Sequence, residues 1–177
     1  MAMHPAAKAA GRRDPGTQQI LTFELGNETY GVEILSVREI RGWTSVTKIP
    51  QTPPHVLGVL NLRGSIVAVV DLRMRFALER AEYTKVTVII VLSVDSPRGQ
   101  QEIGVVVDAV SDVVDFDTAQ MKPAPELGNP SATDYVRGLV PVGERMVVLI
   151  DISRLLDPQL ADLAAGQSGL AAAVEAA

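Results

Sequence analysis

Cysteine is absent from this 177-residue chain, and histidine occurs only as His4 and His55. The lack of cysteine excludes disulfides, thiolate metal sites and cysteine nucleophiles. Aromatic residues make up only 4% of a sequence that is 47% hydrophobic, so the core must be built from aliphatic side chains. No apolar run approaches the ~18 residues that a membrane-spanning helix needs. We therefore expect no direct insertion into a membrane.

Charge is also limited, with 16 basic and 21 acidic residues and a net charge of -5. Because broad binding of nucleic acid needs a basic surface, we do not expect a nucleic-acid partner. The N-terminal region lacks the apolar stretch of a signal peptide, and we expect a cytoplasmic location. This balance is typical of a soluble protein that binds other proteins.

Motifs of catalysis and phosphate binding are missing as well, including Gly-x-Ser-x-Gly, the Walker loop and Gly-x-Gly-x-x-Gly. Three apolar runs end in aspartate, at Asp71, Asp108 and Asp151. Converging carboxylates could bind a metal in a hydrolase, although aspartate at a strand end more commonly accepts hydrogen bonds from the following turn. We expect no catalytic residue, metal or cofactor. A small-molecule-binding barrel stays open as another alternative, and it would need a concave apolar cavity.

Alternation of apolar and polar residues predicts strands at residues 20–25 and 30–34, joined by a tight turn at Gly26-Asn27. The many valines also favour strands. Further strands are predicted at residues 46–49, 66–72, 86–94, 102–110, 135–142 and 145–150, with 113–116 continuing after a bend. Nine or ten short strands at this density indicate barrels or a sandwich. No repeat of 20 to 50 residues is evident.

Helices are expected to be few and short. Residues 56–62 predict one helical turn, and residues 73–78 predict a short helix. Asp157-Pro158 suits the start of a C-terminal helix, with the aspartate as N-cap and proline at the first position. We therefore divide the chain into a disordered lead at 1–17, a folded domain at 18–157, and a C-terminal helix with an Ala-rich tail at 158–177.

Two segments carry residues typical of a protein interface. Charged and aliphatic residues alternate over 37–43, and Arg63 lies in a turn bracketed by Gly58 and Gly64. Glycine permits backbone angles that can aim Arg63 outward, and arginine beside exposed aliphatic residues is common in binding hot spots. Alternatively, Arg63 pairs with an acid inside the fold, for example Asp71. The residues alone leave both possibilities open.

The order and spacing of several motifs resemble the CheW family of chemotaxis coupling proteins over residues 18–157. The motifs are Leu21-Thr22-Phe23-Glu24-Leu25-Gly26, Glu28-Thr29-Tyr30-Gly31-Val32, Val37-Arg38-Glu39-Ile40-Arg41-Gly42, Gly58-Val59-Leu60-Asn61-Leu62-Arg63-Gly64, Val70-Asp71-Leu72-Arg73, Gly104-Val105-Val106-Val107-Asp108, Val110-Ser111-Asp112-Val113 and Pro123-Ala124-Pro125-Glu126. Ala68 departs from the family, whose members often carry proline there. A proline would only restrict an edge position, so the departure changes little.

The resemblance implies a mainly β fold of two small five-stranded β-barrels, packed together with a hydrophobic layer between them. It also implies a non-catalytic adaptor that binds the regulatory domain of the histidine kinase CheA and the cytoplasmic tips of methyl-accepting chemotaxis receptors. Such adaptors join kinase domains, and further CheW copies, in rings recruited to membrane-associated or cytoplasmic receptor arrays. An adaptor of a non-flagellar pathway, controlling twitching, gliding or development, is the alternative within this class.

Site residues are carried over from the same resemblance. Those expected on the surface that couples kinase and receptor are Val37, Glu39, Arg63, Gly58, Gly64 and Leu21. Those expected to line a receptor-binding groove are Val110 and Val113. The resemblance leaves open which partner each residue of the coupling surface contacts.

Overall fold

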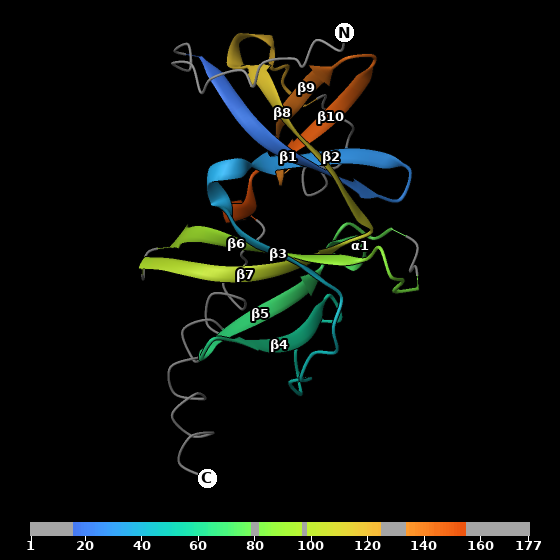
Figure 1. The fold of residues 1–177 in the computed structure, drawn as a ribbon, viewed down its shortest axis with the longest axis vertical. Helices are drawn as coiled ribbons and strands as arrows, with labels where there is room; N and C mark the ends of the chain where they lie inside the picture. The colour runs from blue at the N-terminus through green and yellow to red at the C-terminus, as the bar shows by residue number, and fades with distance from the viewer. Residues whose placement is uncertain (1–15, 79–81, 97–98, 125–133, 155–177) are drawn as a thin grey trace, which may run out of the picture.

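The computed structural model describes residues 16–78, 82–96, 99–124 and 134–154. Ten strands in these ranges form two five-stranded sheets, stacked one above the other in Figure 1. The predicted C-terminal helix lies outside the described residues, as do most of the lead and most of the loop expected after Met121. No helix in the described ranges is long and apolar enough to cross a membrane.

The first sheet has the strand order β8-β1-β2-β10-β9. Its strands are β1 (Thr17–Leu25), β2 (Glu28–Glu33), β8 (Ala109–Asp117), β9 (Val136–Val142) and β10 (Arg145–Ile150). The second sheet has the order β3-β6-β7-β5-β4. Its strands are β3 (Val37–Gly42), β4 (Val56–Leu62), β5 (Ser65–Asp71), β6 (Val88–Ser96) and β7 (Gly99–Val107). The short helical elements are η1 (Ile34–Ser36), α1 (Leu72–Arg75), η2 (Thr118–Gln120) and η3 (Ile152–Arg154).

Apolar side chains form three clusters, one inside the curl of each sheet and the largest between the sheets. Strand β6 shows how one strand serves two of them. Ile89 and Val91 enter the cluster of the second sheet, whereas Ile90 and Leu92 enter the layer between the sheets. A strand buried on both faces reads as a continuous apolar run. The hydrophobic layer expected from the family resemblance is therefore confirmed.

Each sheet curls until its two edges meet at a single bridge rather than a full strand pair. In the second sheet, Thr47 exchanges both backbone hydrogen bonds with Val59 of β4, at 2.8 and 3.0 Å. In the first sheet, Lys122 does the same with Leu139 of β9, at 2.7 and 2.8 Å. The mainly β fold of two five-stranded units is confirmed, and each unit is a nearly closed barrel.

The two sheets are built from two matching halves of the chain, β1–β5 and β6–β10. The hairpin β4–β5 and the hairpin β9–β10 have the same register and bulges at matching glycines, Gly58 and Gly138. Gly31 of β2 and Gly104 of β7 match as well, because each pairs with the parallel strand next to it at the same position. The structure thus contains an internal repeat longer than the 20 to 50 residues searched in the sequence.

The repeats are interleaved rather than side by side. The first two strands of each repeat join the sheet formed by the last three strands of the other. The chain crosses between the sheets at η1, after β2, and again between β7 and β8 (Figure 1). Neither sheet is therefore made from one continuous stretch of chain.

Three sequence predictions of local structure are wrong. Residues 56–62 form strand β4 and not a helical turn, because the bulge at Gly58 interrupts the alternation of apolar residues. The strand expected at 102–110 ends at Val107, and β8 then passes into the other sheet. The strand expected at 46–49 is only the bridge at Thr47, with Pro50 close behind it.

Candidate partner-binding site

Strands β3 and β8 are the edge strands that carry most of the predicted site, and they occupy matching positions in the two repeats. In Figure 1 both cross in front of their own sheet. Val37 of β3 pairs with Leu92, and Val110 of β8 pairs with Phe23. Both inner partners belong to the layer between the sheets, and Val37 and Val110 pack against that layer. The two predicted surfaces therefore occupy matching positions in the two repeats, and each borders the layer between the sheets.

Ile40 and Val113 continue this feature toward solvent. Ile40 pairs with Ile90 and Val113 pairs with Leu21, both of which lie in the layer between the sheets. Ile40 is 44% exposed and Val113 is 43% exposed. Exposed apolar side chains beside a buried layer are candidates for an interaction site. We call Val37, Ile40, Val110 and Val113 the apolar rim.

Ile40 was not among the residues predicted from the sequence. Its position matches that of Val113 in the other repeat, since both strands contain a bulge at the same place. The alternation of charged and aliphatic residues over 37–43 is the sequence signal that includes Ile40, and the pairing register is what aligns Ile40 with Val113.

Arg63 lies in the turn between β4 and β5, and its side chain is 88% exposed. Its backbone φ of 53° and the φ of 87° at Gly64 are those of a tight hairpin turn. The Asn61 side chain accepts a hydrogen bond from the Gly64 amide at 2.9 Å. This turn places Arg63 3.9 Å from the carboxylate of Glu39, which is also 3.9 Å from Arg41.

Arg63 thus pairs with an acid of the fold, as one alternative expected, but that acid is Glu39 and not Asp71. Asp71 is 3% exposed and accepts hydrogen bonds from the amides of Arg73 and Met74, which caps α1. It also accepts one from the Tyr83 hydroxyl at 2.7 Å. The Arg63 side chain is therefore left at the surface beside Glu39.

Leu21 and Gly58 contribute to the site from below the surface. Leu21 is 2% exposed and lies under Val113. Gly58 has a φ of 149°, and a Cβ added there would lie 2.1 Å from the Thr47 carbonyl oxygen. Only glycine therefore fits at position 58, where β4 lies against Thr47, the residue whose bridge to Val59 closes the second sheet. Gly64 serves the turn that presents Arg63.

The three strand-end aspartates have separate structural roles. Asp71 caps α1. Asp108 accepts a hydrogen bond from the Gly26 amide at 2.8 Å and forms an ion pair with Arg73 at 2.5 Å. Asp151 accepts hydrogen bonds from the amide and hydroxyl of Ser153. Within the described residues, no group of His, Cys, Asp or Glu is arranged to hold a metal. The geometry gives no support to a metal-dependent hydrolase.

Tyr30 connects the first sheet to α1 through stacked rings. Its ring centroid lies 6.1 Å from that of Phe23 and 5.7 Å from that of Phe76. Burial, and to a smaller extent the carboxylate of Glu28, raises the pKa of the Tyr30 phenol above its ordinary value. In the pairing scheme Tyr30 lies one strand further from the sheet edge than Phe23, the partner of Val110.

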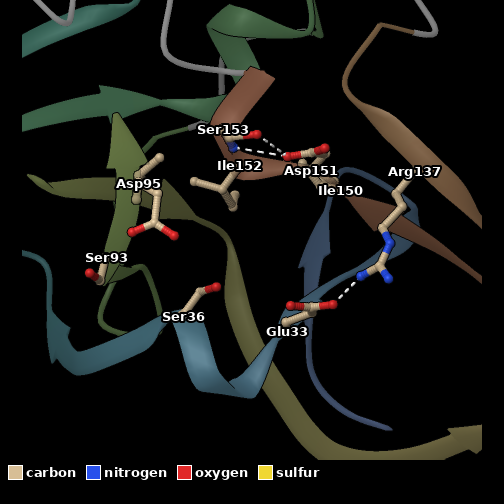
Figure 2. Close-up of a pocket in the computed structure, with 10 residues that line it drawn as sticks. Glu33, Ser36, Ser93, Asp95, Arg137, Ile150, Asp151, Ile152 and Ser153 are labelled. Atoms are coloured by element: carbon tan, nitrogen blue, oxygen red, sulfur yellow. Dashed lines mark hydrogen bonds and ion pairs between the residues drawn. The ribbon is translucent and has the colours of Figure 1, made fainter. Parts of the chain in front are cut away.

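A cleft of about 410 Å³ opens between the sheets beside η1 and η3. Figure 2 shows its carboxylates and serines around the opening and the ion pair between Glu33 and Arg137. We call it the interface cleft, and its lining residues are Glu33, Ser36, Ser93, Val94, Asp95, Arg137, Ile150, Asp151, Ile152 and Ser153. This lining is too polar for the apolar cavity that a small-molecule-binding barrel needs.

The apolar rim and the exposed Arg63 are features of a candidate protein-binding surface, and the three aspartates have structural roles. Comparison with known proteins narrows the class. A family model described as the CheW-like domain matches residues 19–159. The chain belongs to this family, whose members are scaffold or adaptor proteins and not enzymes.

Individual relatives agree with this assignment. The chain is 49% identical to Chemotaxis protein CheW of Klebsiella aerogenes over 80% of its own length and 83% of that protein. It is 28% identical to Protein FrzA of Myxococcus xanthus over 87% and 94% of the two chains. The crystal structure of scaffolding protein TtCheW from Thermoanaerobacter tengcongensis matches with a TM-score of 0.73 and 32% identity, covering 81% of this chain and 94% of that one.

Proposed function

We propose that this chain couples the cytoplasmic tips of chemoreceptors to the regulatory domain of the histidine kinase CheA. The observation that carries the proposal is the apolar rim beside the Glu39–Arg63 pair. Such adaptors act in the cytoplasm, at membrane-associated or cytoplasmic receptor arrays, and we extend that location and the ring contacts with further copies to this chain.

The apolar rim is the surface we assign to the receptor tip. An amphipathic helix binds by laying its apolar side chains into a hydrophobic groove. Val110 and Val113 are the residues we assign to such a groove, and Val37 and Ile40 occupy the matching positions on β3. Because the rim continues into the layer between the sheets, a bound helix would contact both halves of the fold.

Coupling requires that one chain holds two partners at once. Binding of the first partner then makes the second encounter effectively intramolecular. A change in the receptor alters the kinase only if the contacts of the adaptor differ in free energy between the two signalling states. Glu39 lies on β3 with Val37 and Ile40, and Arg63 in the β4–β5 turn pairs with it. We assign both residues to the shared coupling surface, without dividing them between the two partners.

The test is co-purification of the chain with a receptor-tip fragment and the CheA regulatory domain. We expect Arg63→Ala and Val37→Glu each to weaken the ternary complex, by about thirtyfold if each residue is a hot spot worth ~2 kcal/mol. Arg145→Ala is a matched control for Arg63→Ala, because Arg145 is an exposed arginine at the start of β10 and lies 3.9 Å from the carboxylate of Glu24. Met146→Glu is the control for Val37→Glu, since Met146 is 42% exposed on β10.

Normal complex formation by both Arg63→Ala and Val37→Glu would overturn the site assignment. Failure of the unmodified chain to bind either partner would overturn the proposed function itself. Equal losses in the variants and in their controls would show that binding depends on general surface properties. Circular dichroism of each variant should match that of the unmodified chain.

The second candidate is an adaptor of a non-flagellar chemosensory pathway. The similarity to Protein FrzA keeps it in consideration, but its 28% identity lies well below the 49% shared with Chemotaxis protein CheW of Klebsiella aerogenes. Deletion of the gene distinguishes the two proposals. Loss of directed swimming supports the first, whereas normal swimming with impaired surface motility or development supports the second.

A further inference from the structure

The interface cleft has a counterpart in the other repeat, and the two differ in one informative way. Asp151 of the cleft matches Asp71, since each ends the second strand of its hairpin in the same register. The backbone amide of each also donates a hydrogen bond of 2.8 Å, from Asp151 to the Tyr135 carbonyl in one repeat and from Asp71 to the His55 carbonyl in the other. The two places are therefore equivalent in backbone structure.

Side chains close the counterpart but leave the cleft open. Arg73 follows Asp71 by two positions in one repeat, and Ser153 follows Asp151 by two positions in the other. The Arg73 guanidinium bridges to Asp108, whose carboxylate also accepts the Gly26 amide. This ion pair ties α1 of the second sheet to the β1–β2 turn of the first.

In the interface cleft, different residues occupy the two positions that match Arg73 and Asp108. Leu35 of η1 matches Asp108, and it is 75% exposed. Ser153 is too short to cross the space that Arg73 spans in the other repeat. The cleft between the sheets is the result (Figure 2).

We propose that the interface cleft receives a basic side chain of a partner protein, an arginine in preference to a lysine. The lining supplies the carboxylates of Glu33, Asp95 and Asp151 against the single arginine Arg137. Arg137 is already paired with Glu33, and Arg154, which does not line the cleft, lies 3.5 Å from Asp151. Asp95 makes no ion pair among the described residues, so it is the carboxylate that an entering cation would neutralise.

The cleft also suits the stem of an arginine and not only its charge. Val94, Ile150 and Ile152 provide an aliphatic wall along which the methylene groups can pack. Ser36, Ser93 and Ser153 provide further hydroxyl acceptors, and a planar guanidinium carries five donors where an ammonium has three. In the matching place of the other repeat, the Arg73 side chain spans the space between the sheets and pairs with Asp108.

This inference does not rest on the proposed coupling function, and it is tested with the full chain alone. N-acetyl-arginine amide is titrated into ¹⁵N-labelled protein, with N-acetyl-citrulline amide as the neutral analogue of the same shape. We expect arginine to shift the amide resonances of Asp95, Asp151 and Ser153 in a saturable way. Citrulline should leave them almost unchanged.

Two variants locate the binding. Asp95→Asn should weaken the apparent affinity by about two- to fivefold, the effect of one partly solvated ion pair. Asp115→Asn is the matched control, because Asp115 is an exposed aspartate on β8 that does not line the cleft. Ser153→Arg supplies from the chain itself the arginine that the other repeat has at this position, and it should abolish the titration.

Four results would overturn the proposal. Arginine and citrulline could produce the same shifts, or Asp95→Asn could bind as tightly as Asp115→Asn. The third is the absence of any localised shift at ligand concentrations up to about 50 mM, which would place the affinity below a useful range. An unchanged titration in Ser153→Arg would place the arginine elsewhere and equally overturn it.

Discussion

Arg63 is held in a backbone conformation that arginine does not favour. Its φ of 53° lies in the left-handed region, whereas the matching turn of the other repeat carries Gly143 at φ 60°. A side chain with a Cβ costs roughly 1–2 kcal/mol in this region. We expect Arg63→Gly to raise the free energy of unfolding, measured by urea denaturation, by about 1 kcal/mol, while it weakens partner binding as Arg63→Ala does.

The Arg63→Ala variant separates the two effects, because alanine keeps the Cβ and loses the guanidinium. It should bind as weakly as Arg63→Gly without the gain in stability. The ion pair with Glu39 does not alter this expectation, since an exposed pair at 3.9 Å contributes little. Lower stability in Arg63→Gly would mean that Arg63 is kept for the fold and not for a partner.

Tyr30 makes stability depend on pH at the alkaline end. Because burial raises the pKa of its phenol above the ordinary value, the unfolded chain releases this proton at a lower pH than the folded chain does. The contribution of the protonated Tyr30 phenol to the free energy of unfolding is complete below the ordinary tyrosine pKa. It is lost as the pH rises through the raised pKa of the folded state. We expect Tyr30→Phe to show a smaller fall in free energy of unfolding above about pH 10. Parallel curves for both proteins between pH 8 and 11 would contradict this.

At the scale of elements, the closure of the second sheet depends on Gly58. A Cβ there would collide with the Thr47 carbonyl oxygen, and the φ of 149° is itself unfavourable for other residues. We expect Gly58→Ala to lower the free energy of unfolding by about 3 kcal/mol or more. Gly42→Ala is the control, since a Cβ at Gly42 meets nothing within 4 Å. Equal stability of the two variants would show that the bridge at Thr47 does not constrain β4.

The sequence predicted the local hairpins well because their signals are local. Alternating residues and the turn at Gly26 specify β1–β2, and Gly143-Glu144 separates β9 from β10. Strand β4 was missed because the bulge at Gly58 breaks its alternation. Strands β7 and β8 were merged because both are valine-rich and only Asp108 separates them.

The site could be predicted only in part for the same reason. The segments around Val37 and Arg63 were singled out from their residues, whereas Val110 and Val113 came only from the resemblance to a family. The position of Ile40 beside them depends on cross-strand register, which neighbouring residues do not encode. The pairing of Glu39 with Arg63 likewise depends on how far the second sheet curls before β4 meets Thr47. Parallel pairing of β2 with β10 joins distant segments and leaves no local signal.

At the scale of the whole molecule, interleaving makes the two sheets one folding unit. The first repeat, residues 16–78, supplies strands to both sheets, and so does the second, residues 82–154. We expect urea to unfold the full chain in one transition that is coincident by circular dichroism and by Trp43 fluorescence. Each repeat expressed alone should lack a dispersed NMR spectrum, and mixing the two should restore it. A single repeat that folds as a monomer would contradict this, since β1 and β2 would then pair with β3, β4 and β5 of their own repeat.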